Sequence, residues 1–180
     1  MTAFYMPWES QFLLWIQVNL RTKRITKWMR RITLLGNGGM LWLLISVLLL
    51  GFRSRRLLAV AILMAQLFGI LITNLLLKNT VKRKRPYETI SQLEALLPPQ
   101  RDWSFPSGHT TSSVSASLLL LLHLPFWIGI PCMGIALCIV WSRMYLGVHY
   151  PTDILGGILI GTVCAITAKY FVFYILHRFI

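Results

Sequence analysis

Three short polar clusters in this sequence carry the residue types that phosphate chemistry uses. They occupy residues 78–86, 106–109 and 142–153. Lysine and arginine neutralise phosphoryl oxygens, and histidine acts as a nucleophile or transfers a proton. Each cluster alone also has an ordinary explanation, because juxtamembrane basic runs commonly contact lipid headgroups and a histidine near a helix cap can be incidental. The three clusters indicate a phosphate-binding catalytic site only if the fold brings them close together in space.

The second cluster, Pro-Ser-Gly-His at residues 106–109, predicts the start of a helix. Ser107 is a natural N-cap, and Gly108 permits a close approach to the backbone. A helix N-terminus presents free N–H groups and the positive end of the helix dipole, which suits an anion. His109 would then lie in the first turn, beside a bound anion.

The third cluster pairs a histidine with a carboxylate. His149 and Asp153 are four residues apart, in a turn that leads into the last apolar run. A carboxylate at the edge of a membrane span is costly unless it is paired, which makes Asp153 a functional candidate. Paired with one ring nitrogen of His149, it would fix the tautomer and leave the other nitrogen free to attack.

The composition places these clusters in a membrane protein. Of the 180 residues, 56% are hydrophobic and 13% are charged, whereas soluble domains have about 45–50% apolar and about 25% charged residues. The predicted fold class is an all-α integral membrane protein, with residues 1–180 forming a single domain. Five apolar runs approach the roughly 20 residues that cross a hydrocarbon core. These expected transmembrane helices are residues 36–52, 57–77, 107–124, 126–145 and 153–176.

The segment before the first span is amphipathic. Residues 8–35 place basic side chains and tryptophans at helical spacing, which predicts an interfacial helix at the N-terminus. The alternative is a short sixth span followed by a basic loop. In the last span, Gly157 and Gly161 are spaced so that a neighbouring helix can approach closely.

Counting the crossings brings the three clusters to one membrane surface. The second span ends at residue 77, the loop 78–105 follows, and the third span begins after it. The turn at residues 124–125 lies on the far side, so the junction of the fourth and fifth spans returns to the side of the loop. All three polar clusters therefore meet at the same face.

The formal net charge of +13 indicates that the binding partners are anionic. In a soluble protein it would suggest nucleic acid, but the aromatic residues do not alternate with lysine and arginine as a strand-binding platform would. We expect the bilayer and an anionic lipid phosphate as partners, and no nucleic acid.

Taken together, the clusters resemble the three signature motifs of the type-2 phosphatidic acid phosphatase superfamily. The matching pattern is Lys78-x6-Arg85-Pro86, then 106–109 as Pro-Ser-Gly-His, then Ser142-Arg143-x5-His149-x3-Asp153. The resemblance implies a metal-independent histidine phosphatase that hydrolyses a phosphomonoester or pyrophosphate of a membrane lipid. Its implied substrates are of the phosphatidic acid, phosphatidylglycerol phosphate or undecaprenyl pyrophosphate type.

The resemblance also implies a role for each residue. His149 would attack phosphorus and become a phosphohistidine, Asp153 would orient it, and His109 would be the general acid and then the base. The phosphoryl oxygens would be held by five residues: Lys78, Arg85, Ser107, Gly108 and Arg143. No metal and no cofactor are expected, since cations replace them. The neighbouring Lys82, Arg83 and Lys84 are assigned to attraction of headgroups.

The orientation depends on two opposing signals. Basic residues gather on the motif face, which by the positive-inside rule would be cytoplasmic. Several of them are needed for phosphate, however, and the basic turn 53–56 is typical of a cytoplasmic hairpin. We therefore expect a multi-pass protein of the plasma or inner membrane with its active site facing the periplasm or cell exterior.

Three other functions remain open from the sequence. His109, His149 and Asp153 could form a two-histidine, one-carboxylate metal site, although the nearby cations would repel a metal ion. A protein that binds or moves anionic lipid without cleaving it would need the basic clusters but not the His149–Asp153 pair. A lipid phosphotransferase would pass the phosphoryl group to an acceptor other than water.

Overall fold

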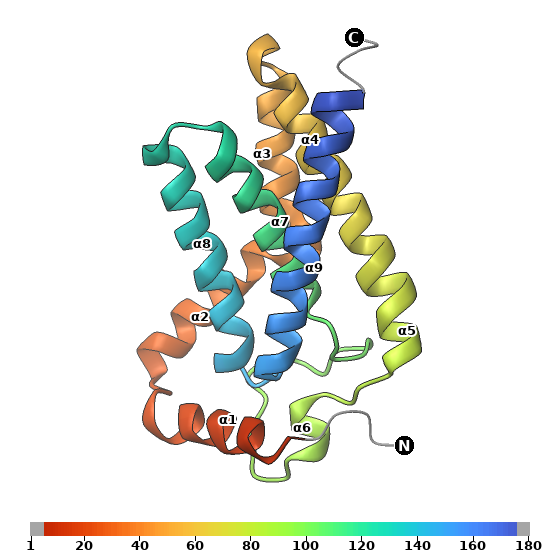
Figure 1. Ribbon diagram of the computed structural model, residues 1–180. Helices are drawn as coiled ribbons and strands as arrows, with labels where there is room; N and C mark the ends of the chain where they lie inside the picture. Colours follow the sequence, from red (N-terminus) through yellow and green to blue (C-terminus); the bar gives the residue numbers. More distant parts are fainter. Residues whose placement is uncertain (1–5, 176–180) are drawn as a thin grey trace.

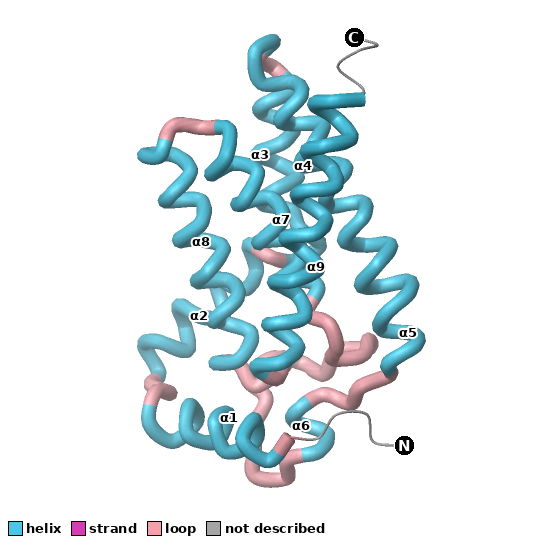
Figure 2. Tube along the Cα trace, in the orientation of Figure 1, coloured by secondary structure: helices cyan, strands magenta, loops and turns pink. Residues whose placement is uncertain are grey.

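The computed structural model describes residues 6–175, and within them the chain is helical, without strands (Figure 1). A long bundle stands on a layer of loops and short helices at one end. Figure 2 shows that the longer loops gather at this end, together with α1 (Pro7–Asn19). The bundle therefore has one polar end, as the counting of crossings predicts.

The helix α7 (Gly108–His123) lies at the centre of the bundle. It packs against α8 (Phe126–Tyr145), α9 (Pro151–Tyr170) and α4 (Arg56–Ile70). The predicted close approach at the two glycines of the last span is confirmed. A Cβ atom on Gly157 would lie 2.7 Å from Thr110 Cβ, and one on Gly161 would lie 2.7 Å from the Thr111 carbonyl oxygen. Larger side chains there would push α9 away from α7.

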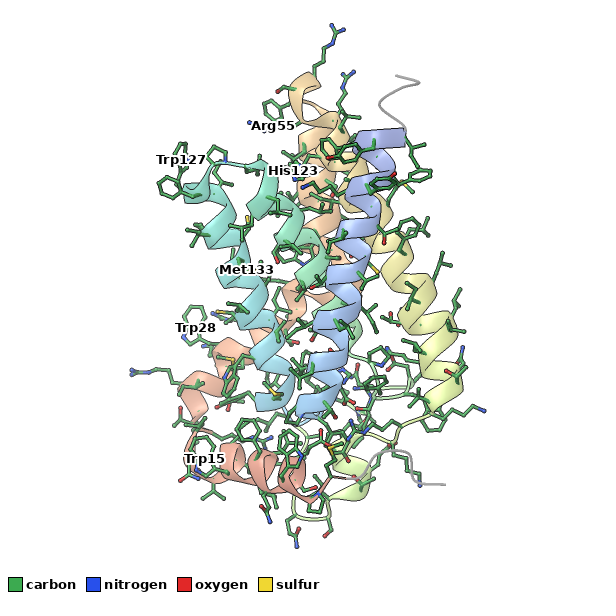
Figure 3. All side chains as sticks on the ribbon, in the orientation of Figure 1. Trp15, Trp28, Arg55, His123, Trp127 and Met133 are labelled. Atoms are coloured by element: carbon green, nitrogen blue, oxygen red, sulfur yellow. The ribbon has the colours of Figure 1, made fainter. Side chains whose placement is uncertain are left out.

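Large apolar side chains cover the outer surface of these helices. On α9, for example, Leu155, Leu159 and Ile166 are 58–67% exposed, which fits contact with lipid rather than water. Aromatic residues mark both ends, with Trp15 near the polar end and Trp127 near the other (Figure 3), as in the aromatic belts of membrane proteins. The chain is an integral membrane protein.

Three helical segments are long and apolar enough to cross a membrane: Arg53–Thr89, Phe126–Tyr145 and Pro151–Ile175. A fourth would be the pair Lys23–Leu35 and Asn37–Leu50, which is bent by 46°. These segments cover most of four of the five expected spans, although the helix in the first of them ends at Leu50 rather than at residue 52. The remaining one, α7, has 16 residues, fewer than the roughly 20 that cross a hydrocarbon core. Residue 176 of the last expected span lies outside the described residues.

The N-terminal segment 8–35 forms two helices rather than one. They are α1 and α2 (Lys23–Leu35), and the side chain of Thr22 caps α2 by accepting a hydrogen bond from the backbone N–H of Ile25 at 3.2 Å. The residues around Gly38, where φ is +57°, then turn the chain from α2 into α3 (Met40–Leu50). The bend directs α2 along the lower half of α8 (Figure 1).

The expected loop 78–105 contains two short helices, α5 (Lys78–Val81) and α6 (Pro86–Thr89). Before α5, the chain passes from α4 through a π-helical segment, η3 (Leu71–Leu77). Such segments are rare and are frequent at functional sites. The π-helical segment ends at Leu77, directly before Lys78, the first residue of the first polar cluster.

Candidate active site

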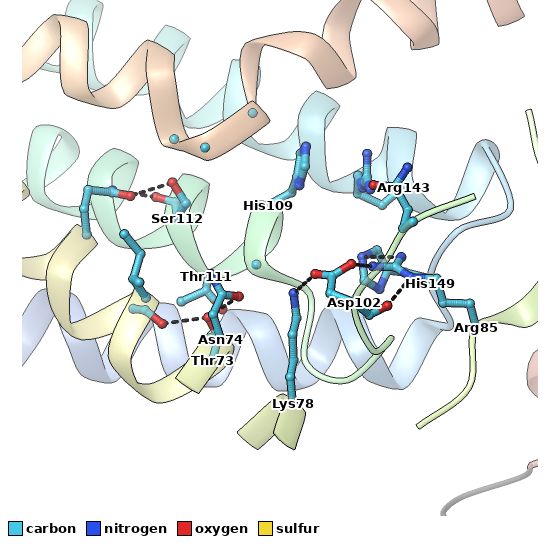
Figure 4. A pocket seen from close by; sticks show the side chains of 18 residues that line it. Thr73, Asn74, Lys78, Arg85, Asp102, His109, Thr111, Ser112, Arg143 and His149 are labelled. Atoms are coloured by element: carbon cyan, nitrogen blue, oxygen red, sulfur yellow. Dashed lines mark hydrogen bonds and ion pairs between the residues drawn. The ribbon is translucent and has the colours of Figure 1, made fainter. Parts of the chain in front are cut away.

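The polar end of the bundle contains a cavity of about 270 Å³ to which all three clusters contribute. Its lining includes Lys78 and Arg85 from the first cluster, His109 from the second, and Arg143 and His149 from the third (Figure 4). These residues come from the helix ends and loops around α7. The structure thus brings together residues separated by up to 71 positions in the chain, between Lys78 and His149.

Three cations line this cavity, and we call Lys78, Arg85 and Arg143 the cationic cage. The side chains of Lys78 and Arg85 are 7% and 3% exposed. Arg143 lies in the last turn of α8 and donates to the Thr33 hydroxyl of α2 at 2.6 Å. Because the cage is largely withdrawn from water, its charges act on a bound anion with little screening.

His149 lies beside the cage and is 2% exposed. Its Nε2 is 3.4 Å from Arg85 Nη1, and its Nδ1 is 3.4 Å from Asp153 Oδ2. At that distance Nδ1 makes no aligned hydrogen bond within the described residues. Burial, and then the charges of Arg85 and Arg143, lower the pKa of His149 well below 6.5. The ring is therefore held neutral at neutral pH.

The carboxylate of Asp153, in the first turn of α9, is fully buried behind His149. Its Oδ2 accepts hydrogen bonds from Ser104 Oγ at 2.5 Å and from the Tyr150 backbone N–H at 2.8 Å. Its Oδ1 accepts one from Arg83 at 2.7 Å. Every one of these contacts fixes the carboxylate in the orientation in which Oδ2 faces His149.

The second cluster forms the N-terminus of α7 as predicted. Ser107 is the N-cap, and its hydroxyl accepts from the backbone N–H of Thr110 at 3.4 Å and from the Thr110 hydroxyl at 3.0 Å. Gly108 lines the cavity, whereas Ser107 is fully buried and does not line it. In this structure the serine side chain is thus occupied in capping the helix.

His109 faces the bend between α2 and α3. Its Nε2 is 3.0 Å from Asn37 Oδ1, and a Cβ atom on Gly36 would lie only 2.6 Å from its Cδ2. The backbone of Thr33 also forms a hydrogen bond with this ring. The segment that follows the N-terminal helices therefore positions a residue of the central motif, a contact that no sequence pattern predicts.

An acidic residue outside the three clusters, Asp102, occupies the cage. Its carboxylate accepts hydrogen bonds from Lys78 Nζ at 2.5 Å and from Arg85 Nη2 at 2.6 Å (Figure 4). Its side chain is 51% exposed. Partial burial raises the pKa of Asp102, but the hydrogen bond and charge of Lys78 and the charge of Arg85 outweigh it and lower the pKa to about 2.

Two further charged residues are buried in the structure, and the sequence analysis misassigned one of them and overlooked the other. Arg83 is 3% exposed, so its assignment to headgroup attraction is wrong. It pairs with Glu9 of α1, which is fully buried. The chain has only 5 acidic against 18 basic residues, and buried acids require partners. That imbalance was the signal that could have directed attention to Glu9 and Asp102.

The alternative of a metal site finds no support in the side-chain geometry. Between residues 6 and 175, no three histidine, cysteine, aspartate or glutamate side chains are grouped closely enough to hold a metal ion. Of the three proposed ligands, Asp153 is instead engaged by Arg83, Ser104 and the backbone.

A helical membrane bundle with a cavity lined by histidines and cations at one end is the fold and site of a membrane phosphatase class. Residues 55–176 match the PAP2 superfamily, so the chain belongs to that superfamily. Undecaprenyl-diphosphatase from Sulfolobus acidocaldarius is 30% identical over 121 residues, which are 67% of this chain and 58% of that protein. The match thus spans less than two thirds of that relative.

Two further relatives cover more of the chain. Phosphatidylglycerophosphatase B from Bacillus subtilis is 32% identical over 165 residues, which are 86% of this chain and 78% of that protein. The crystal structure of LpxE from Aquifex aeolicus superposes with a TM-score of 0.82 at 25% identity, covering 93% of this chain and 98% of that one. The helical architecture is thus shared over nearly the whole chain.

Proposed function

We propose that this protein is a lipid phosphate phosphatase that works through a phosphohistidine. The observation that carries the proposal is that His149, which is neutral, lines the same cavity as His109 and the cationic cage. Phosphoryl transfer requires little covalent chemistry from a protein and much charge stabilisation on the three equatorial oxygens. The cage supplies that charge without a cofactor.

In the first step, His149 Nε2 attacks phosphorus as the bond from phosphorus to the leaving oxygen breaks. Nδ1 then carries the proton of an imidazolium ring, whose charge Asp153 offsets. The separation of 3.4 Å between Nδ1 and Oδ2 is longer than a good hydrogen bond. Such contacts often tighten only when charge develops in the reaction, and we expect the same here.

The leaving oxygen takes its proton from His109, and the lipid product departs. In the second step His109 accepts a proton from water, whose oxygen attacks the phosphohistidine and releases inorganic phosphate with a neutral His149. Lys78, Arg85 and Arg143 hold the phosphoryl oxygens. The backbone N–H of Gly108, at the start of α7, adds a donor at the positive end of a helix dipole, and Ser107 keeps this turn in place.

The substrate class follows from the relatives and the membrane. Their names point to phosphorylated or pyrophosphorylated lipids, namely undecaprenyl diphosphate and phosphatidylglycerophosphate. We propose a lipid of the phosphatidic acid, phosphatidylglycerol phosphate or undecaprenyl pyrophosphate type for this chain.

We also propose that the site faces the periplasm or cell exterior of a plasma or inner membrane. Of the basic residues near the motifs, Lys78, Arg85 and Arg143 line the cavity and Arg83 is buried in ion pairs. These residues serve the site, so they carry little weight in the positive-inside rule. Labelling of a cysteine introduced at exposed Gln92 with a membrane-impermeant maleimide, in intact cells, tests this orientation.

Phosphate release from a panel of these lipids, measured with purified protein in mild detergent, tests the function. Wild type should release phosphate and form an acid-labile phosphoprotein, and His149→Ala should do neither. A protein that binds the lipids in both forms without releasing phosphate would instead be a lipid-binding or transport protein. Transfer of the phosphoryl group to an added alcohol in preference to water would indicate a phosphotransferase.

A further inference from the structure

The buried pair of Arg83 and Glu9 lies outside the roles assigned so far. Arg83 is 3% exposed and Glu9 is fully buried, whereas the neighbouring Lys82 and Lys84 are exposed. Burying a charge is costly unless it is paired and hydrogen-bonded. The burial of these two charges, which come from distant parts of the chain, therefore needs an explanation. Their contacts with other residues provide one.

Arg83 connects its own loop to α1 and to the first turn of α9 through one guanidinium group. Its Nη2 donates to Glu9 Oε2 at 2.6 Å, and its Nη1 donates to Asp153 Oδ1 and to Thr152 Oγ1, both at 2.7 Å. Glu9 in turn accepts from the backbone N–H and the hydroxyl of Thr152, at 3.0 and 2.6 Å. The guanidinium also lies 4.0 Å above the ring of Tyr150. These contacts join α1 to the first turn of α9.

The contacts divide the two oxygens of Asp153 between different partners. Oδ1 faces Arg83, while Oδ2 faces His149 and is held by Ser104 and the backbone of Tyr150. Rotation of the carboxylate away from His149 would break the charged contact with Arg83. The fork of a guanidinium holds such geometry better than a single ammonium does. Arg83 is close to the reacting residues but does not line the cavity.

We infer that Arg83, held by Glu9 of the N-terminal helix, is a positioning residue that keeps Asp153 ionised and aimed at His149. The inference rests on the proposed function, because it assigns Asp153 to the support of the imidazolium. The charged and titratable groups around Asp153 are Arg83 and His149, which contact its carboxylate, Tyr150, which interacts with its charge, and Glu9, which lies on the other side of Arg83. Of these, only Arg83 is a permanent cation, so its charge favours the ionised form of Asp153 at every pH, together with the hydrogen bonds from Ser104 and the Tyr150 backbone.

The first test is the pH profile of Arg83→Gln. We expect kcat to fall about tenfold near pH 6, with KM nearly unchanged because Arg83 does not line the cavity. An adjacent opposite charge typically shifts a carboxyl by about 1–3 pH units, so the acid limb of kcat should move upward by about one unit. Activity should then recover in part at alkaline pH. A loss of kcat by the same factor at every pH would overturn the inference.

The conservative variant separates charge from geometry. Arg83→Lys retains a positive charge but cannot reach Glu9, Thr152 and Asp153 together. The acid limb should return toward its wild-type position, while kcat stays below that of wild type. An acid limb displaced as far as in Arg83→Gln would contradict the role assigned to the charge. Lys84→Gln, which removes an exposed charge one residue away, should leave the acid limb in place.

The double variant excludes a purely structural role. Arg83→Gln leaves the buried Glu9 without its cation, so the variant could simply fold poorly. Adding Glu9→Gln removes that unpaired charge and should restore helical content and melting temperature in detergent. We expect the acid limb to stay displaced. Recovery of wild-type kcat and pH profile in the double variant would show that Arg83 serves only to neutralise Glu9.

The same experiment distinguishes a failure of the proposed function from a failure of the role assigned to Arg83. A wild-type protein that releases no phosphate, or a His149→Ala variant that remains active, would remove the basis of the phosphohistidine mechanism. A wild-type protein that is active, with His149 essential and with every Arg83 variant showing an unshifted acid limb, would overturn only the role of Arg83.

Discussion

Arg85 and Asp102 form an ion pair beside the ring of His149, with 2.6 Å between Nη2 and Oδ1. The same carboxylate also binds Lys78, so one acidic side chain joins two of the three cations of the cage. Asp102 belongs to none of the three motifs. A phosphoryl group bound by Lys78 and Arg85 would compete with this carboxylate for the same donors.

Asp102→Asn should strengthen binding of phosphate. The carboxylate is half exposed, and ion pairs of that kind contribute up to about 1 kcal/mol, so KM for the lipid and the inhibition constant of inorganic phosphate should each fall by about two- to fivefold. The pKa of about 2 keeps Asp102 ionised throughout an ordinary assay range, so the change should not depend on pH. Steady-state kinetics measure both constants.

Glu94→Gln, an equal change of charge in the same loop, serves as the control for Asp102→Asn. A rise in KM for Asp102→Asn alone would contradict the prediction.

The acid limb of kcat/KM should lie below pH 6.5. Burial and the cage lower the pKa of His149, so its ring stays neutral, and able to attack, as the pH falls past the value at which an ordinary histidine gains a proton. Activity should be lost only when the pH falls below the lowered pKa of His149. The substrate phosphate ionises near about pH 6 and its contribution must be subtracted. A corrected limb at or above pH 6.5 would argue against a buried neutral nucleophile, and His123→Gln, at the far end of the bundle, should leave the limb unchanged.

Removal of divalent metals should not affect turnover. The cavity is lined by three cations, which stabilise the phosphoryl oxygens and would repel a metal ion. Phosphate release should therefore be the same, within error, with and without EDTA. Loss of activity in EDTA, restored by one added metal, would contradict the proposed chemistry. Elemental analysis of the purified protein gives an independent measurement.

Gly36→Ala should reduce kcat by about tenfold or more, because small displacements of a catalytic group are costly. Its new methyl group would lie 2.6 Å from His109 Cδ2 and 2.7 Å from Ile139 Cγ2. The backbone at Gly36 has φ of −86°, which alanine adopts freely, so the effect reports on packing rather than on backbone strain. Gly134→Ala, with open space around its Cβ position, is the matched control. A variant that folds normally and retains full kcat would show that His109 tolerates displacement.

The sequence by itself determined the membrane class, the helical architecture and the meeting of three motifs at one end of the bundle. Apolar runs of nearly the length of a bilayer set the helices, and the number of crossings set the shared face of Lys78, His109 and His149. These properties are local or follow from counting, so they can be read without coordinates. The N-capping serine at the start of α7 was predictable for the same reason, because a cap depends on its immediate neighbours.

Only the tertiary structure decided which charges pair. The sequence offered Asp153 as the partner of His149, but not that Arg83 would hold its other oxygen, that Glu9 would arrive from α1, or that Asp102 would bind Lys78 and Arg85. The same holds for Gly36 and Asn37 against His109. Several of these contacts join residues 70 or more positions apart, and all of them depend on how the helices and loops are arranged in space. No periodicity or spacing along the chain encodes those contacts, because they form only when the bundle is assembled.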